Sequence, residues 1–135
     1  MRQTFENLKQ IGTGPYQDYN FCTVAALAMA LDWSFGKAHR HMAKHGRKNK
    51  RGMYSAEWVP ALTQAAESCD KAVTDITRNG YRGMTIGRFA REYKRGVYVI
   101  KVRGHALCVR DGVMHDWTAD TARRRKIIQI LKVEG

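Results

Sequence analysis

The chain of 135 residues has few prolines, few cysteines and few acidic residues, and each shortage excludes a class of protein. Two prolines and the lack of a low-complexity tract argue against a long linker or a second domain. Three cysteines are too few, and odd in number, for a disulfide framework. No apolar run approaches the ~20 residues of a membrane-spanning helix. The first residues, Met1 to Glu6, lack the apolar core of a signal peptide. We therefore expect one domain over residues 1–135, cytoplasmic and not bound to a membrane, with free thiols.

The residues that are plentiful are apolar or basic. Hydrophobic residues make up 44% of the chain, enough to build a core and to exclude a disordered tail. Lysine and arginine number 24 against 12 acidic residues, which gives a net charge of +12. Such an excess favours association with a polyanion, either a nucleic acid or an acidic protein, and does not specify a fold.

The most apolar stretch runs from Phe21 to Leu31 and is rich in alanine. It is too long for an ordinary strand and has no polar face, which is typical of a helix buried on all sides. Asn20 is a suitable N-cap, since its side-chain oxygen can accept from a free backbone N–H of the first turn. We therefore expect a buried central helix with Cys22 in its first turn.

Other patterns predict four more helices and then a set of strands. The helices are a short one ending at Gly12, one from Ser34 to about His45, one beginning near Ser55 and one from Thr85 through Tyr93. The strands are a short one within 71–76 and longer ones at 97–103, 105–110, 113–117 and 127–133. Helices followed by an antiparallel sheet indicate the α+β class, with the buried central helix packed on a C-terminal sheet.

Asp111-Gly112 is a strong signal for a two-residue hairpin turn. Such a turn fixes the cross-strand pairs, which are Arg110 with Val113, Cys108 with His115 and Leu107 with Asp116. Because side chains alternate along a strand, His105 and Asp116 share one face as diagonal neighbours, with Cβ atoms within ~7–8 Å. Cys108 and His115 lie on the other face. The register therefore predicts that a carboxylate can meet the His105 imidazole.

A thiol at a helix N-terminus complements such a pair. The partial positive charge of the helix end favours the thiolate of Cys22, a nearby imidazole can take its proton, and a carboxylate can fix the imidazole tautomer. The thiol, the imidazole and the carboxylate would then supply the nucleophile, the base and the orienting group that covalent catalysis uses.

The segments Asn20–Leu27 and Gly104–Val109, together with Asp116, resemble the papain-like cysteine peptidase superfamily. The likeness is to its compact bacterial and phage-encoded branches, and the layout is similar to the leader peptidases of bacteriocin exporters. The resemblance implies a papain-like fold with Cys22 as nucleophile, His105 as base and Asp116 as orienting residue. The glycine and tryptophan that flank the cysteine in papain itself are absent.

The same resemblance implies an oxyanion-binding glutamine about six residues before the cysteine, and Gln17, five residues before Cys22, is the candidate. It implies a thiol-dependent hydrolase that cleaves a peptide or isopeptide bond in a protein or peptide substrate, with no cofactor. Acyl transfer and amide deamidation stay open as alternatives. Small size and high basicity favour a phage or mobile-element protein acting in the bacterial cytoplasm.

Simpler explanations exist for each of these residues. A cysteine in an alanine-rich helix is usually a packing residue, and His105 can be a core histidine with satisfied hydrogen bonds. Cys69 and Cys108 are expected to be structural. His41 and His45 have a spacing that can hold a metal, but no glutamate lies between them and no nearby Cys/His group completes a zinc site, so no metal is expected.

The basic residues support a second function class. The stretch from Lys37 to Arg51 contains no acid and is expected to be a solvated basic face. The candidate polyanion-binding residues are Lys48, Lys50, Arg51, Arg123, Arg124 and Arg125. The alternative function is therefore a basic module that binds nucleic acid or an acidic protein, including an inactive enzyme on the same fold. No recognised nucleic-acid-binding motif is present.

Overall fold

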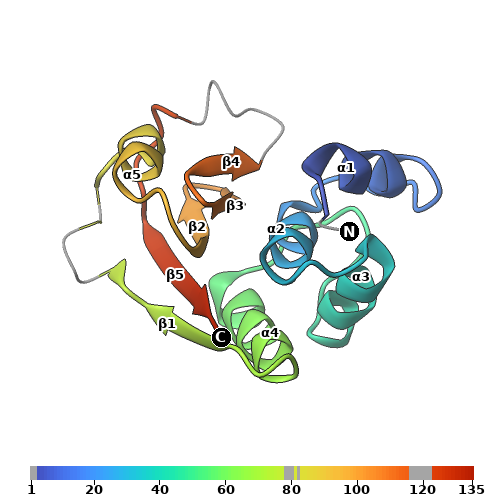
Figure 1. The fold of residues 1–135 in the computed structure, drawn as a ribbon. Helices are drawn as coiled ribbons and strands as arrows, with labels where there is room; N and C mark the ends of the chain where they lie inside the picture. Colours follow the sequence, from blue (N-terminus) through green and yellow to red (C-terminus); the bar gives the residue numbers. More distant parts are fainter. Residues whose placement is uncertain (1–2, 78–80, 82, 116–122) are drawn as a thin grey trace.

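A computed structural model describes residues 3–77, 81, 83–115 and 123–135, in which helices precede most of the sheet (Figure 1). The helices are α1 (Phe5–Thr13), α2 (Cys22–Leu31), α3 (Phe35–Lys44), α4 (Ser55–Glu67) and α5 (Ile86–Glu92). The strands are β1 (Ala72–Asp75), β2 (Val97–Val102), β3 (His105–Arg110), β4 (Val113–His115) and β5 (Gln129–Glu134). This arrangement confirms the α+β class.

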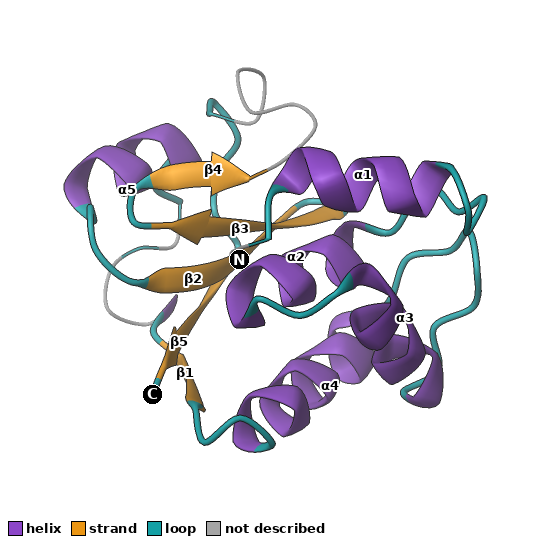
Figure 2. Ribbon diagram, turned by 45° about the vertical axis from the view of Figure 1, so that its right-hand side comes forward, coloured by secondary structure: helices purple, strands orange, loops and turns teal. Residues whose placement is uncertain are grey.

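The strands form one antiparallel sheet in the order β1-β5-β2-β3-β4. Helices α2 and α4 pack on one face, α4 beside β1, with α1 and α3 against α2, and α5 covers the other face (Figures 1 and 2). Two apolar clusters correspond to these two faces. Within the described ranges, no helix has both the length and the apolar character needed to cross a membrane.

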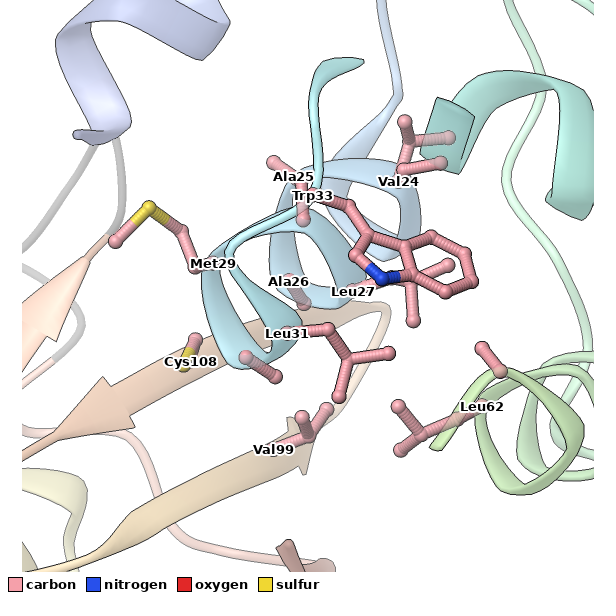
Figure 3. Close-up of a cluster of buried hydrophobic side chains, with 14 of the residues drawn as sticks. Val24, Ala25, Ala26, Leu27, Met29, Leu31, Trp33, Leu62, Val99 and Cys108 are labelled. Carbon is pink, nitrogen blue, oxygen red and sulfur yellow. The ribbon is translucent and has the colours of Figure 1, made fainter. Parts of the chain in front are cut away.

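Helix α2 is the centre of the larger cluster. Every residue from Thr23 to Leu31 is buried, which confirms the prediction from its lack of a polar face. Figure 3 shows Val99 and Cys108 of the sheet on one side of the helix and Leu62 of α4 on another. Surrounded in this way, α2 holds its first residue, Cys22, in a fixed position relative to the sheet.

Ser34 and Thr85 cap the two helices that were expected to begin at them, whereas the predicted Asn20 cap is wrong. Ser34 accepts from the Lys37 N–H at 3.1 Å, and Thr85 accepts from the Arg88 N–H at 3.3 Å. Asn20, however, does not cap α2, because Phe21 occupies the N-cap position and makes no side-chain capping bond. Asn20 has a left-handed backbone, and its side-chain N–H donates to the Lys50 carbonyl at 3.3 Å. It ties two loops together instead.

The β3–β4 hairpin has the predicted register. Cys108 pairs with His115 and Arg110 with Val113. Alternation along β3 places Cys108 in the α2 cluster and Leu107 in the α5 cluster. The next predicted pair, Leu107 with Asp116, lies outside the described residues.

The hairpin turn depends on glycine at its second position. Gly112 has φ +78°, and a Cβ there would lie 3.1 Å from the Ala90 carbonyl oxygen. Gly112→Ala is expected to lower the free energy of unfolding by about 1–2 kcal/mol, since a left-handed L-residue costs that much even without the contact. Urea denaturation measures the change. Gly52→Ala is the matched control, because its Cβ would meet nothing within 4 Å. Equal stability of the two variants would contradict this account of the turn.

Candidate active site at the start of the central helix

Cys22 is the first residue of α2, and the residue before it is firmly anchored. The Phe21 ring is fully buried and meets the Phe35 ring edge-on, with centroids 5.2 Å apart. Gly12 makes room for it, because a Cβ at position 12 would lie 2.7 Å from the Phe21 ring. Packing of Phe21 therefore fixes where α2 begins, and it leaves the Cys22 side chain half-buried at the surface of the core.

The Cys22 thiol meets the start of β3. It is hydrogen-bonded to the His105 side chain and to the backbone N–H of Ala106. Burial of the thiol raises its pKa, but these hydrogen bonds, the charge of His105 and the Thr23 N–H together outweigh burial and leave the pKa of Cys22 below its usual value. The site therefore favours the thiolate, which is the nucleophilic form.

His105 is positioned by the turn between β2 and β3. It is the first residue of β3 and pairs with Val102, the last residue of β2. Gly104 has φ +72°, a conformation that glycine adopts without strain, so the turn brings the chain sharply back at His105. The structure thus brings together two of the sequence-predicted residues, Cys22 and His105, from positions 83 residues apart in the chain.

Two hollows meet at this thiol–imidazole pair. The first hollow, of about 450 Å³, is lined by Thr13, Tyr19, Asn20, Phe21, Cys22, Gly52, Gly104 and His105. The second hollow, of about 460 Å³, is lined by Cys22, Thr23, Arg51, Gly52, Met53, Tyr54, Trp58, Lys101, Gly104, His105 and Ala106. A Cβ at Gly52 or Gly104 would meet nothing within 4 Å, so the space beside Cys22 and His105 is open at these two glycines. An extended ligand can therefore lie across Cys22 with one part in each hollow.

A buried ion pair supports the loop that forms the first hollow. Arg47 donates two hydrogen bonds to the Asp18 carboxylate, at 2.9 and 3.1 Å, and the side chains are 1% and 0% exposed. Asp18 also accepts from the Lys50 N–H at 2.7 Å and lies 3.1 Å from the His39 ring nitrogen. Arg47 reaches the carbonyl of Asn20 as well, at 3.4 Å. This network connects the loop before Cys22 to the loop after α3.

Arg47 is buried, so its prediction as part of a solvated basic face is wrong, and the network was not predicted from the sequence. No local pattern distinguishes Arg47 from the lysines and arginines around it, since its partner lies 29 residues earlier. Burial alone would raise the pKa of Asp18, but the hydrogen bonds from Arg47 and Lys50 and the charge of Arg47 hold it below its usual value. Its ionisation therefore stabilises the fold above pH ~4 and ceases to do so as the pH falls through the lowered pKa.

Gln17 and Asp116 are the remaining predicted site residues. Gln17 is exposed, has a left-handed backbone at φ 47° and is not among the residues that line either hollow. Its role at an oxyanion therefore stays a prediction. Asp116 lies outside the described residues, so its assignment as the orienting carboxylate continues to rest on the hairpin register.

The candidate polyanion-binding residues lie in two separate segments. Lys48, Lys50 and Arg51 are exposed in the loop between α3 and α4, and Lys50 extends over the Tyr19 ring, 5.9 Å from its centroid. The segment 123–125 lies beside α5, where the Arg123 carbonyl accepts from the Gly87 N–H at 3.0 Å and Arg125 donates to the Arg103 carbonyl. Of these six residues, Arg51 lines the second hollow, and the other five line neither hollow.

The histidines of α3 are engaged in packing. The His41 Nε2–H donates to the Ala61 carbonyl at 2.7 Å, and the ring meets Trp33 edge-on. Burial lowers the pKa of His41, as does the charge of His45, whereas the bond to Ala61 raises it. Across residues 3–77, 81, 83–115 and 123–135, no three His, Cys, Asp or Glu residues are grouped as a metal site would require.

Comparison of the chain with protein-family models, with curated protein sequences and with solved structures finds no match. The assignment of a function therefore depends on the geometry and chemistry of the site itself.

Arg47→Met tests the importance of the buried ion pair. The variant leaves the Asp18 carboxylate buried without its main partner, so the free energy of unfolding should fall by about 3–5 kcal/mol at neutral pH. This loss of stability should become smaller as the pH falls, because burial without Arg47 raises the pKa of Asp18 and the variant takes up a proton there before the wild-type protein does. Urea denaturation at several pH values measures both effects.

Arg88→Met is the matched control, since Arg88 pairs with Glu92 on the exposed surface of α5. This substitution should hardly change stability. If the two arginine variants are equally stable, the Asp18–Arg47 pair does not hold the loop.

Proposed function

We propose that the protein is a cysteine hydrolase of papain-like type that cleaves a peptide or isopeptide bond. The observation that carries the proposal is the hydrogen bond between Cys22 and His105 at the meeting point of two hollows. A packing cysteine does not need an imidazole partner, and a core histidine does not need to face solvent-filled space. The lowered pKa of Cys22 supports the same conclusion, because burial alone would raise it.

In the proposed reaction the Cys22 thiolate attacks the substrate carbonyl carbon and forms a carbon–sulfur bond. The tetrahedral intermediate collapses, the carbon–nitrogen bond breaks, and protonated His105 gives its proton to the leaving amine. A water molecule then attacks the thioester, with His105 taking its proton, and the Cys22 thiolate is released. Transfer to another amine in place of water would make the same site an acyltransferase, and a side-chain amide as substrate would make it a deamidase.

The charge that develops on the carbonyl oxygen needs hydrogen-bond donors. The backbone N–H of Cys22 is one such donor, since the first N–H groups of a helix have no partner within it. Gln17 is proposed as a second donor on the basis of the family resemblance. Asp116 is proposed to accept from the second ring nitrogen of His105 and to hold the imidazole in the required tautomer.

The basic surface supports a complementary role in substrate choice. Lys48, Lys50 and Arg51 are exposed, Arg51 lines the second hollow, and the chain carries a net charge of +12. An acidic protein substrate would be attracted by this field before it reaches Cys22. Binding of a nucleic acid or an acidic protein without catalysis is the second candidate function, and an unreactive Cys22 would favour it.

Selective alkylation tests the proposal. With limiting iodoacetamide near neutral pH, Cys22 is expected to react well before Cys69 and Cys108, because a larger fraction of it is thiolate. His105→Gln should slow the reaction of Cys22 by removing the partner that favours the thiolate. Peptide mass spectrometry locates and quantifies the label.

His45→Gln is the matched control, since His45 lies at the end of α3 and lines neither hollow. It should leave the labelling of Cys22 unchanged. Equal labelling of all three cysteines, or a Cys22 that does not react in the folded protein, would contradict the proposal.

Two asparagine substitutions test the orienting carboxylate. Asp116→Asn should sharply slow reaction of Cys22 with a peptide vinyl-sulfone probe, by up to about 10⁴-fold where His105 must act as a base. The loss is smaller if a preformed thiolate–imidazolium pair supplies most of the reactivity. Asp111→Asn should have little effect, because Asn-Gly forms the same turn and the amide oxygen can still accept from the Gly96 N–H. Loss of labelling in Asp111→Asn alone, with circular dichroism showing both variants folded, would refute the assignment.

A further inference from the structure

The second hollow has a chemical character that the proposed reaction does not require. Two cationic side chains, Lys101 and Arg51, and an aromatic wall of Trp58 and Tyr54 surround it. Neither hollow is lined by an aspartate or a glutamate among the described residues. The positive charge in the second hollow is therefore not neutralised by any acid in its described lining.

Lys101 is held close to the reactive pair by the sheet register. It lies directly across from Ala106 in the β2–β3 ladder, and the Ala106 N–H is hydrogen-bonded to the Cys22 thiol. The half-buried Lys101 donates a hydrogen bond through Nζ to the Ser55 hydroxyl at the start of α4. An ammonium group has three N–H donors, so one is used to orient the side chain and two remain for a ligand.

Thr23 supplies an independent indication of a ligand. This residue is only 4% exposed, yet its hydroxyl oxygen has no hydrogen-bond partner within the described part of the chain. A buried hydroxyl without a partner is costly, and a threonine in a helix can avoid it by bonding to a carbonyl one turn earlier. Thr23 lines the second hollow beside Cys22, so a rotation of its side chain would offer the buried hydroxyl to an acceptor on a bound molecule.

We propose that the second hollow binds a carboxylate of the substrate next to the bond that Cys22 attacks. The carboxylate accepts from Lys101 and from the Thr23 hydroxyl, Arg51 adds charge at the rim, and Trp58 contacts the aliphatic part of the same residue. A glutamate or aspartate side chain has this chemistry, and so does a free C-terminal carboxylate. The inference rests on the proposed function and adds a preference for an acidic substrate to it.

The ratio of two alkylation rates at Cys22 tests this preference. Iodoacetate and iodoacetamide form the same carbon–sulfur bond and release the same iodide, but only iodoacetate carries a carboxylate. Lys101→Met is expected to lower the iodoacetate-to-iodoacetamide ratio by about tenfold, the effect of losing one charge-assisted hydrogen bond. Thr23→Val should also lower the ratio while leaving the fold at least as stable, because it removes a buried hydroxyl without a partner.

Lys132→Met is the matched control. Lys132 pairs across the sheet with Tyr98, whose ring belongs to the α5 cluster, so it lies on the opposite face from the hollow. The same loss of charge there should leave the ratio at the wild-type value. Arg51→Gln, in an exposed loop, provides a second variant that keeps the fold if Lys101→Met does not, and it should lower the ratio by a smaller factor.

The proposed carboxylate site would be overturned if the iodoacetate-to-iodoacetamide ratio stayed unchanged in Lys101→Met, Thr23→Val and Arg51→Gln. It would also be overturned if the ratio fell as far in Lys132→Met as in Lys101→Met. The proposed function is judged separately by the absolute rate with iodoacetamide, because the ratio can be measured even when Cys22 reacts slowly. Electrophilic peptide probes then separate the two carboxylate sources. An internal glutamate replaced by glutamine tests the side chain, and a free C-terminus replaced by an amide tests the chain end.

Discussion

The hydrogen bond between the Cys22 thiol and His105 is the interaction on which the whole site depends. It requires the first residue of α2 and the first residue of β3 to meet, although the two lie in different halves of the chain. Helix α2 is held in place by apolar contacts (Figure 3). His105 is placed by the sharp turn at Gly104. The core therefore does more than stabilise the fold, since its packing sets the position of the thiol relative to the imidazole.

A second constraint acts on the chain just before Cys22. The loop from Asp18 to Phe21 forms a wall of the first hollow, and a loop of this kind would be mobile without support. The buried Asp18–Arg47 pair and the buried Phe21 ring hold it at both ends. A buried ion pair gives little net stability relative to apolar residues, but it fixes a single arrangement of the groups around it. Its value here lies in the geometry of the hollow.

Several features could be predicted from the sequence because local chemistry determines them. The register of β3 and β4 follows from a two-residue Asp111-Gly112 turn, and the burial of α2 follows from a helix without a polar face. The Asn20 cap was wrong because the loop needs a left-handed residue there, and its side chain is used to bond Lys50.

Other features leave no local signal. In the sequence, Arg47 cannot be distinguished from the exposed basic residues around it, because only the fold places Asp18 beside it. Lys101 is one charged residue in an apolar strand, and only the packing of α4 against the sheet gives it the Ser55 partner and a place in the second hollow. The meeting of Cys22 and His105 was anticipated from chain order and family resemblance, and no periodicity in the sequence predicts it.

Direct titration of the Cys22 thiol tests the central claim. Thiolate absorbs in the ultraviolet, and the difference between the wild-type protein and Cys22→Ala isolates the signal of this one residue as the pH is raised. The account predicts that the pKa of Cys22 lies below the usual value for a free cysteine, because the hydrogen bonds from His105 and the Ala106 N–H outweigh its burial. Deprotonation at or above that value, as burial alone would produce, would show that the thiol is a packing residue and would contradict the account.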